Sequence, residues 1–317
     1  MATQDYTSFN NVVDIGDVLL MSQLESNLKT YLDWSFLGVG AFRNITIPTS
    51  GAYGGTYDNL RVVKDLAYDD GQVWEAARKD LVWETGVEYA SQPINISGVR
   101  VASTLYGTGD ATFGHHYNYP LGRVVFDTAI NMNSSVQLEH SYRNVQVYIA
   151  DQAPWWDELQ YNSHRVDDAT FSDIGSGNWQ IPGNHRVQMP AIVVEAVPRR
   201  QFKPYQLGNV GQYVYQDVLF HIIAETRWWR NQLTDIISLQ ADRTLWMYDN
   251  NTVASSGVYS LDHRGMVVNN PTMYPDLVNK YSYKMARFYN MVVMEMNSYS
   301  SRLHQGTVRA TFEIVIA

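Results

Sequence analysis

Histidines are the side chains of this chain best suited to acid–base or metal chemistry. His115 and His116 form its only histidine doublet. Because neighbouring residues on a strand point to opposite faces, the two rings cannot easily bind one metal ion. His221 should lie on the face of its strand opposite Phe220, which favours a hydrogen-bonded core or interface histidine over a catalytic base. We therefore expect structural roles for all three.

Paired carboxylates are a second possible source of chemistry. Asp157 and Glu158 directly follow Trp155 and Trp156. Two carboxylates can cleave a glycosidic bond, so a carbohydrate-active enzyme is a remote alternative. Adjacent acids on a polar segment are more often solvated, and we expect that role here.

A further acidic segment could bind a cation. Asp167, Asp168 and Asp173 lie close to Gly175 and Gly177. Calcium loops place oxygen ligands at alternate positions, and this segment lacks that order. We expect no metal site in it.

Known catalytic and cofactor motifs are missing. The sequence has no phosphate-binding loop, no nucleophile elbow and no zinc-binding histidine pair. Its glycines at 107, 109 and 114 do not have the spacing of a dinucleotide loop. With no cysteine, the chain has no disulfide, thiol catalyst or zinc–thiolate site. We expect a protein that is not an enzyme, with no catalytic residue, cofactor or metal.

The first elements predicted from hydrophobic periodicity are a helix and a short strand. Leu20, Leu24, Leu28 and Leu32 recur on one face of a helix over residues 17–37. A strand should follow at 44–47. From residue 60 to 150, short alternating runs separated by turn residues indicate an all-β unit.

The C-terminal part predicts a second unit. Strands are expected at 191–195, 213–224 and 245–248, with a closing pair at 291–296 and 307–316. An amphipathic helix over 226–240 should begin at the cap Thr226, and it should cover the sheet together with helix 17–37.

Together these elements predict a β-rich α+β fold. A mixed or antiparallel sheet flanked by helices forms the core from residues 1–58 and 185–317. Residues 59–150 form an all-β insertion, and residues 151–184 form a linker or extended segment that Trp155 and Trp156 should anchor onto a sheet.

The composition is typical of a protein that contacts other subunits. Charged residues make up 17% of the 317 residues, against ~25% in soluble domains. Aromatic residues reach 13%, with 22 Tyr and 9 Trp, and aromatic enrichment with few charges is typical of interface cores. A large β-protein is the alternative interpretation, because aromatic residues also favour strands.

The net charge of −9 argues against wrapping nucleic acid, which requires a basic surface. An acidic wall would instead repel phosphate and let DNA pass. The N-terminus has no signal-peptide pattern, and no run approaches the ~20 apolar residues of a membrane span. We expect a soluble protein made in the cytoplasm, without membrane contact.

Tryptophan and arginine dominate interface hot spots, so they guide the choice of interface residues. Trp228 is preferred to Trp229, which we expect in the buried stripe of helix 226–240. An aromatic–basic cluster at 280–289 suggests a contact surface, with single-strand stacking as the alternative. The predicted subunit-interface residues are Trp155, Trp156, Arg227, Trp228, Arg230, Tyr283 and Arg287.

Several segments resemble proteins of tailed bacteriophages. Residues 119–127 (YPLGRVVFD), 136–140 and 142–147 are similar to β-structured parts of virion proteins from marine and cyanobacterial phages with contractile tails. Helix 17–37, strands 192–195 and 213–224, helix 226–240 and strand 307–316 resemble the tail-terminator, or tail-completion, fold. The insertion at 59–150 departs from a minimal terminator.

This resemblance implies a structural virion subunit located in the tail or neck. Tail terminators form hexameric rings at the head-proximal end of the tail tube. The implied partners are copies of the chain, the head connector, the tail tube and the sheath, with DNA only passing through the lumen. The alternative is a capsid-surface or collar protein for fibre attachment, which binds partner proteins or glycans.

Overall fold

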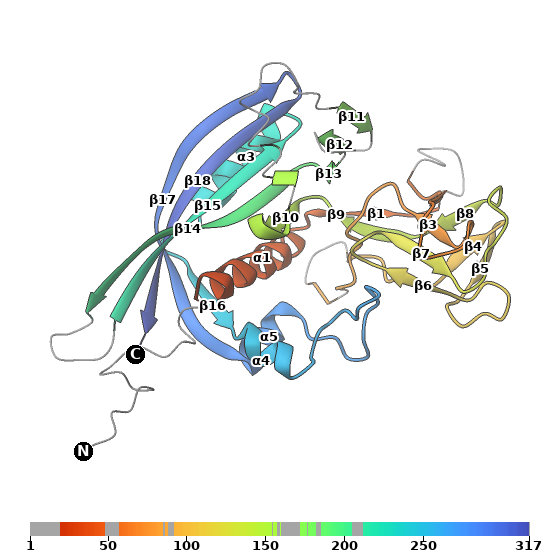
Figure 1. The fold of residues 1–317 in the computed structure, drawn as a ribbon, viewed down its shortest axis with the longest axis horizontal. Coiled ribbons are helices and arrows are strands. Elements are labelled where there is room, and N and C mark those ends of the chain that lie inside the picture. Colours follow the sequence, from red (N-terminus) through yellow and green to blue (C-terminus); the bar gives the residue numbers. More distant parts are fainter. Residues whose placement is uncertain are drawn as a thin grey trace.

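A six-stranded sheet is the largest element of the computed structural model (Figure 1). Its order is β10-β14-β15-β18-β17-β16; only the β10–β14 pair is parallel. The structure describes residues 20–47, 57–84, 86–87, 92–153, 155–156, 159, 172–175, 177–181, 185–204 and 212–316. The strands of this main sheet are β10 (Gln146–Ile149), β14 (Ala191–Pro204), β15 (Gln212–Ala224), β16 (Thr244–Tyr248), β17 (Ser282–Ser300) and β18 (Leu303–Ile316).

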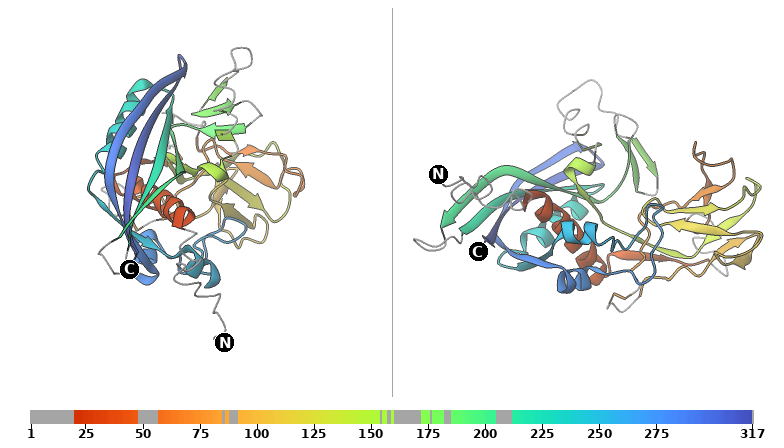
Figure 2. Two further views of the ribbon diagram at one scale, coloured as in Figure 1. Left: turned by 60° about the vertical axis from the view of Figure 1, so that its left-hand side comes forward. Right: turned by 60° about the horizontal axis from the view of Figure 1, so that its bottom comes forward.

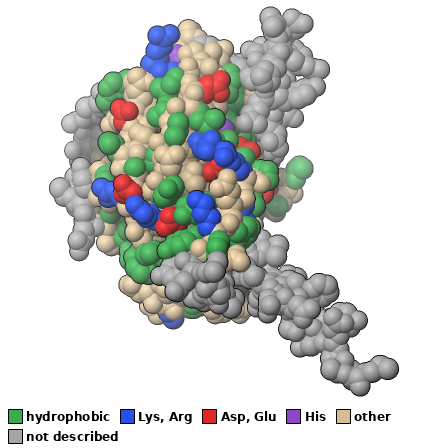
Figure 3. All heavy atoms as spheres, turned by 90° about the vertical axis from the view of Figure 1, so that its left-hand side faces the viewer, with side chains coloured by type: hydrophobic (Ala, Val, Ile, Leu, Met, Phe, Trp, Pro, Cys, Tyr) green, Lys and Arg blue, Asp and Glu red, His purple; other side chains and the backbone are tan. Residues whose placement is uncertain are grey.

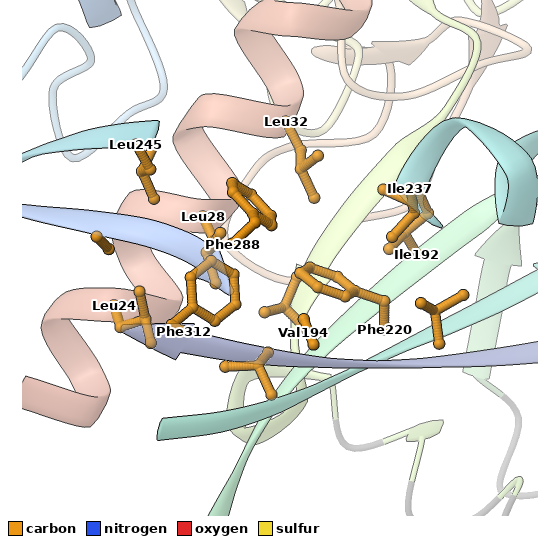
Figure 4. Close-up of a cluster of buried hydrophobic side chains, with 14 of the residues drawn as sticks. Leu24, Leu28, Leu32, Ile192, Val194, Phe220, Ile237, Leu245, Phe288 and Phe312 are labelled. Carbon is orange, nitrogen blue, oxygen red and sulfur yellow. The ribbon is translucent and has the colours of Figure 1, made fainter. Parts of the chain in front are cut away.

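Two helices pack against the same face of the main sheet. The sheet is strongly curled, and α1 (Leu20–Gly38) and α3 (Arg227–Ser238) lie along its length (Figure 2). Leu24 and Leu28 of α1 meet Phe288 and Phe312 of the sheet, while Ile237 of α3 packs further along the same core (Figure 4). Burial of these side chains gives roughly 1.5–3 kcal/mol each. We call this the helix-covered face and the other the outer face.

Short strands form a separate β-rich region with its own core. One sheet has the order β2-β3-β7-β6 and another β5-β4-β8, while β1 pairs with β9. Trp74, Val124, Phe126 and Leu138 are central in the buried cluster between them. The strands are β1 (Phe42–Ile45), β2 (Arg61–Val62), β3 (Val73–Glu75), β4 (Val99–Val101), β5 (Thr104–Tyr106), β6 (His115–Asn118), β7 (Arg123–Phe126), β8 (Val136–Leu138) and β9 (His140–Arg143).

A small antiparallel sheet covers one end of the outer face. It consists of β11 (Ser172–Gly175), β12 (Asn178–Ile181) and β13 (His185–Gln188). Trp179 of this sheet and Trp156 pack with Val193 and Ile223 of the main sheet. The predicted anchoring of the tryptophan segment onto a sheet is therefore confirmed.

The remaining helices are short. They are the 3₁₀ turn η2 (Ala150–Gln152), α4 (Asn250–Ser255) and α5 (Tyr274–Lys280). Val253 of α4 and Leu277 of α5 pack around Tyr248. Among the described helices, none is both long and apolar enough to cross a bilayer.

The β-rich α+β class and the mixed sheet flanked by helices are confirmed. Helix α1 starts at Leu20 in the described residues and buries the predicted leucines; residues 17–19 lie outside them. Residues 146–149, expected in the insertion, form β10 at the edge of the main sheet. The aromatic–basic cluster at 280–289 is mostly the first half of β17, because the closing hairpin is longer than its apolar segments indicated.

Candidate assembly interface

Helix α3 presents two tryptophans at its N-terminal end. Thr226 caps the helix as predicted, since the Trp229 backbone N–H donates to its hydroxyl at 3.2 Å. Trp228 is 63% exposed and Trp229 36% exposed, with their rings edge to face at 4.9 Å. The expectation that Trp229 is buried was wrong. The buried stripe runs through residues 230, 233, 234 and 237, which leaves Trp229 about 100° away around the helix.

Arg230 is not available to a neighbouring subunit. It is buried, and its guanidinium donates to Asn231 Oδ1 at 3.0 and 2.8 Å and to the Asn297 carbonyl at 3.3 Å. The predicted interface role is corrected because these contacts fix α3 to β17 within one chain. Arg227 is exposed one turn earlier, as an interface residue must be.

Trp155 and Trp156 are also corrected as interface residues. Both are buried inside the chain: Trp156 lies against the His221 ring at 4.5 Å, and Trp155 against Tyr148 at 5.4 Å. The local sequence could not distinguish these buried tryptophans from the exposed Trp228, because their burial depends on strands that are distant in the sequence.

Tyr283 and Arg287 lie on the first half of β17. Tyr283 is half-buried against the main core, which leaves it little surface for another chain. Arg287 is exposed; it donates to Asp242 Oδ1 at 2.7 Å and lies 5.9 Å from the Tyr289 ring centre. An exposed ion pair of this kind contributes little stability, so Arg287 remains free to exchange partners.

An apolar strip that the sequence analysis missed runs along the second half of β17. The exposed side chains are Tyr289, Val292, Val293, Met294 and Met296. Between residues 289 and 298, no strand in the described chain pairs with the outer side of β17. Val292, which pairs with Arg309, belongs to the outer face. With Trp228 and Trp229 of α3, residues 293, 294 and 296 form what we call the β17–α3 patch. Its signal in the sequence was the run Met-Val-Val-Met-Glu-Met, which resembles an ordinary buried strand.

The outer face carries interspersed positive and negative charges (Figure 3). Asp217 is central: Arg309 Nε lies 3.3 Å and Arg199 Nε 3.7 Å from its Oδ2, and the Thr311 hydroxyl donates to its Oδ1 at 2.7 Å. Lys203 lies over the Tyr215 ring at 4.7 Å, beside a shallow hollow of about 160 Å³. This local cluster is not an acidic wall.

A larger hollow of about 960 Å³ lies between α1, β10, α4, α5 and the loop after β3. A buried ion cluster forms part of its wall. Arg143 Nη1 lies 3.2 Å from Asp80 Oδ1, and Nη2 lies 2.5 Å from Glu84 Oε1. Trp34, Trp83, Tyr148, Tyr248 and Tyr274 also line the hollow. No local sequence pattern indicates this cluster, because its members come from distant segments.

Burial sets the protonation of this cluster. Burial raises the pKa of Asp33 to about 7, with the attraction of Arg143 only partly opposing it. Burial also raises the pKa of Glu84, again partly offset by Arg143. Burial alone would lower the pKa of Arg143, but Glu84, Asp80 and Asp33 outweigh it and raise that pKa. The arginine therefore stays charged and holds the acids together.

The three histidines considered as chemical groups lie on strands β6 and β15. His115 is buried and contacts the Phe113 carbonyl and Tyr117 hydroxyl, whereas His116 is half-buried on the other face of β6. His221 is buried opposite Phe220 in the ladder, with Nε2 2.8 Å from Glu195 Oε2. Its hydrogen bond lowers the pKa of Glu195.

The acidic candidates are not placed by the structure. Asp157, Glu158, Asp167 and Asp168 lie outside the described residues, as does the side chain of Asp173. Among the side chains that are described, no three His, Cys, Asp or Glu residues are grouped as metal ligands. The sequence matches no protein-family model and no curated protein.

Proposed function

We propose that this chain is a structural, non-enzymatic subunit of a tailed-phage virion. In this role it forms a ring as a tail terminator or neck protein, joining the tail tube and sheath to the head connector. The β17–α3 patch carries the proposal, because large exposed apolar side chains on neighbouring elements are typical of protein contacts. The β-rich α+β core, with helices on one face of its sheet, supports the tail-terminator resemblance of the sequence.

Ring closure constrains where the contacts lie. A closed ring with more than two copies needs head-to-tail contacts between unlike surfaces. The patch is one such surface, and Trp228 is its most exposed aromatic residue. Truncating a hot-spot tryptophan in an interface to alanine commonly costs about 2 kcal/mol or more of binding free energy.

The charge distribution is relevant to DNA passage. The chain carries a net charge of −9, which favours passage of DNA through a lumen without adhesion. The outer face beside β14, however, presents Arg199, Lys203 and Arg309 around Asp217. A lumen that repels phosphate therefore requires another surface, and we place the outer face away from the DNA.

The direct test is imaging and mass measurement of the purified protein. Negative-stain images should show closed rings with a central hole, and sedimentation should give a single closed oligomer. Trp228→Ala should shift the mass toward monomer with little change in melting temperature. Leu239→Ala is the matched control, because Leu239 is also exposed and apolar but lies at the other end of α3. A wild-type protein that stays monomeric at high concentration contradicts the proposal.

A second candidate function is binding of partner proteins or glycans at the capsid surface or collar. The aromatic lining of the 960 Å³ hollow favours it, since ligand sites are concave and rich in aromatic side chains. Glycan-array binding by a monomer, abolished by Trp34→Ala, would support this function instead of the ring.

A further inference from the structure

The main sheet has two open edges, and they lie on opposite sides. On one side, β10 pairs with β14 only through Val194, so residues 199–204 of β14 have no outer strand among the described residues. On the other side, β16 pairs with β17 only through Arg287, which leaves residues 289–298 open. Within the described part of the chain, each edge presents backbone groups without a strand partner, and these could template pairing with another chain.

The two edges differ in chemistry. The open part of β17 is apolar, with Met294 56% exposed, and Glu295 is its only ionisable acid or base apart from the Tyr289 phenol. The open part of β14 carries Arg199, Arg200 and Lys203 with no acid, and its Phe202 is 55% exposed. Their charges are therefore complementary.

We propose that β17 of one copy pairs with β14 of the next, so that the main sheets join edge to edge. This inference rests on the proposed ring function and names its contact. Pairing of β14 with β14 would bring three cations against three, which disfavours it. Pairing of β17 with β17 would oppose two glutamates and leave the cationic edge open. Only the unlike pair places Glu295 near Lys203, which belongs to the outer face as Glu295 does.

Strand direction is consistent with this contact. Three successive antiparallel pairs separate β14 from β17, so the two strands run in opposite directions within one chain. A rotation axis roughly along the strands preserves their directions. The β17 strand of one copy therefore meets β14 of its neighbour antiparallel, in the more stable arrangement.

The positions of the edges set the offset between copies. Glu295 is level with His221 of β15, and Gln201 is level with Tyr215, six residues earlier in that strand. At ~3.4 Å per residue, this offset is about 20 Å. From β14 of one copy to β14 of the next there are four interstrand steps, which span about 19 Å at ~4.8 Å each. Closure then requires a strand tilt of about 45°, within the range of closed barrels.

Register irregularities on β17 and β14 limit which strands can pair with these two edges. The β17–β18 ladder shifts register between Val293 and Glu295, and the β14–β15 ladder shifts between Ala196 and Arg200. Bulges and charges protect edges from arbitrary strands. We infer that the contact is limited to the short segments 290–297 of β17 and 199–203 of β14, which excludes long flat partners.

Engineered cysteines test the contact directly, because the chain has none of its own. Gln201 and Val292 both belong to the outer face, since they pair with Tyr215 and Arg309. The double variant Gln201→Cys/Val292→Cys, treated with a short bismaleimide, should give a covalent ladder of dimer, trimer and higher species. Each single variant should give no ladder. A ladder that stops at the dimer, or rings without crosslinks, overturns the pairing while leaving the ring function intact.

Charge reversal provides a second measurement. Lys203→Glu and Glu295→Arg should each raise the concentration for half-assembly about tenfold, because like charges then face each other. An equimolar mixture of the two variants should restore assembly, since every junction then pairs opposite charges. Leu66→Lys, at an exposed site in the β-rich region, is the control and should change nothing. Unchanged assembly of both single variants, or a mixture that stays dissociated, contradicts the inference, and a monomeric wild type removes it together with the ring function.

Discussion

Replacing Arg143 with methionine tests the buried ion cluster that joins the β-rich region to the main core. Arg143 on β9 contacts Asp80 and Glu84 and donates to the Leu81 carbonyl at 3.4 Å, while Asp33 of α1 lies in its field. Both Arg143 and Glu84 are buried. Methionine fills similar volume but leaves the acids without their cation.

The expected cost follows from burial. Removing one partner of a buried ion pair typically costs about 3–5 kcal/mol. Asp80 is partly exposed and can recover solvation, so we expect about 3 kcal/mol at pH 8. The matched control is Lys64→Met, which removes the same charge from an exposed pair with Asp70 and should cost under about 0.5 kcal/mol.

The pH dependence of the Arg143→Met deficit gives a sharper test. Burial raises the folded-state pKa values of Glu84 and Asp33 above their unfolded values. Folding then takes up protons, so stability rises as pH falls through the folded pKa values toward the unfolded ones. Without Arg143 this uptake is larger, and the deficit should shrink between pH 8 and pH 5.

Urea unfolding followed by tryptophan fluorescence at the two pH values measures both effects. Glu84→Gln in the Arg143→Met background should recover part of the loss, because it removes the buried anion. A deficit under about 1 kcal/mol, or one that is equal at pH 8 and pH 5, would refute the reasoning.

Three further predictions concern the core and its charges. Asp33→Asn should stabilise the protein at pH 8 and have little effect near pH 4. The raised pKa of about 7 means that the wild-type carboxyl destabilises the folded state only as pH rises through that value. Thermal melts at both pH values measure this, and equal shifts in melting temperature would contradict it. Gly306→Val should lower the free energy of unfolding by about 1–3 kcal/mol, since an added Cβ would lie 2.8 Å from Thr234 Oγ1 and push α3 from β18. Gly107→Ala, which has open space around it, is the control in the same unfolding assay. Phe312→Ala should cost about 3–5 kcal/mol at the centre of the main core, and a loss under about 1 kcal/mol in urea unfolding would show that this core is not packed as described.

Local periodicity identified the elements because each pattern depends on residues a few positions apart. The leucines of α1 and the cap at Thr226 follow from helical spacing and from one side chain bonding to a nearby N–H. In the same way, apolar and polar residues alternate along 307–316, which predicts that Phe312 and Ile314 share the buried face of β18 and that Arg309 lies on the other.

Side-chain environment was less predictable where it depends on partners distant in the sequence. Trp156 and Trp228 are the same amino acid and each belongs to a Trp-Trp pair. Trp156 is nevertheless buried against His221, whereas Trp228 is exposed on α3. Arg230 was expected at an interface because of its residue type. Its guanidinium instead donates a hydrogen bond to the carbonyl of Asn297, 67 positions later in the chain.

The sequence by itself determined the β-rich α+β class, the buried faces of β15 and β18 and the absence of thiol chemistry. Only the tertiary structure decided the strand order, the place of β10 beside β14, the cluster around Arg143 and the open edges of β14 and β17. The physical reason is range. Helical and strand patterns are set by backbone geometry between neighbours, whereas strand pairing and burial are set by the packing of segments separated by tens to hundreds of residues.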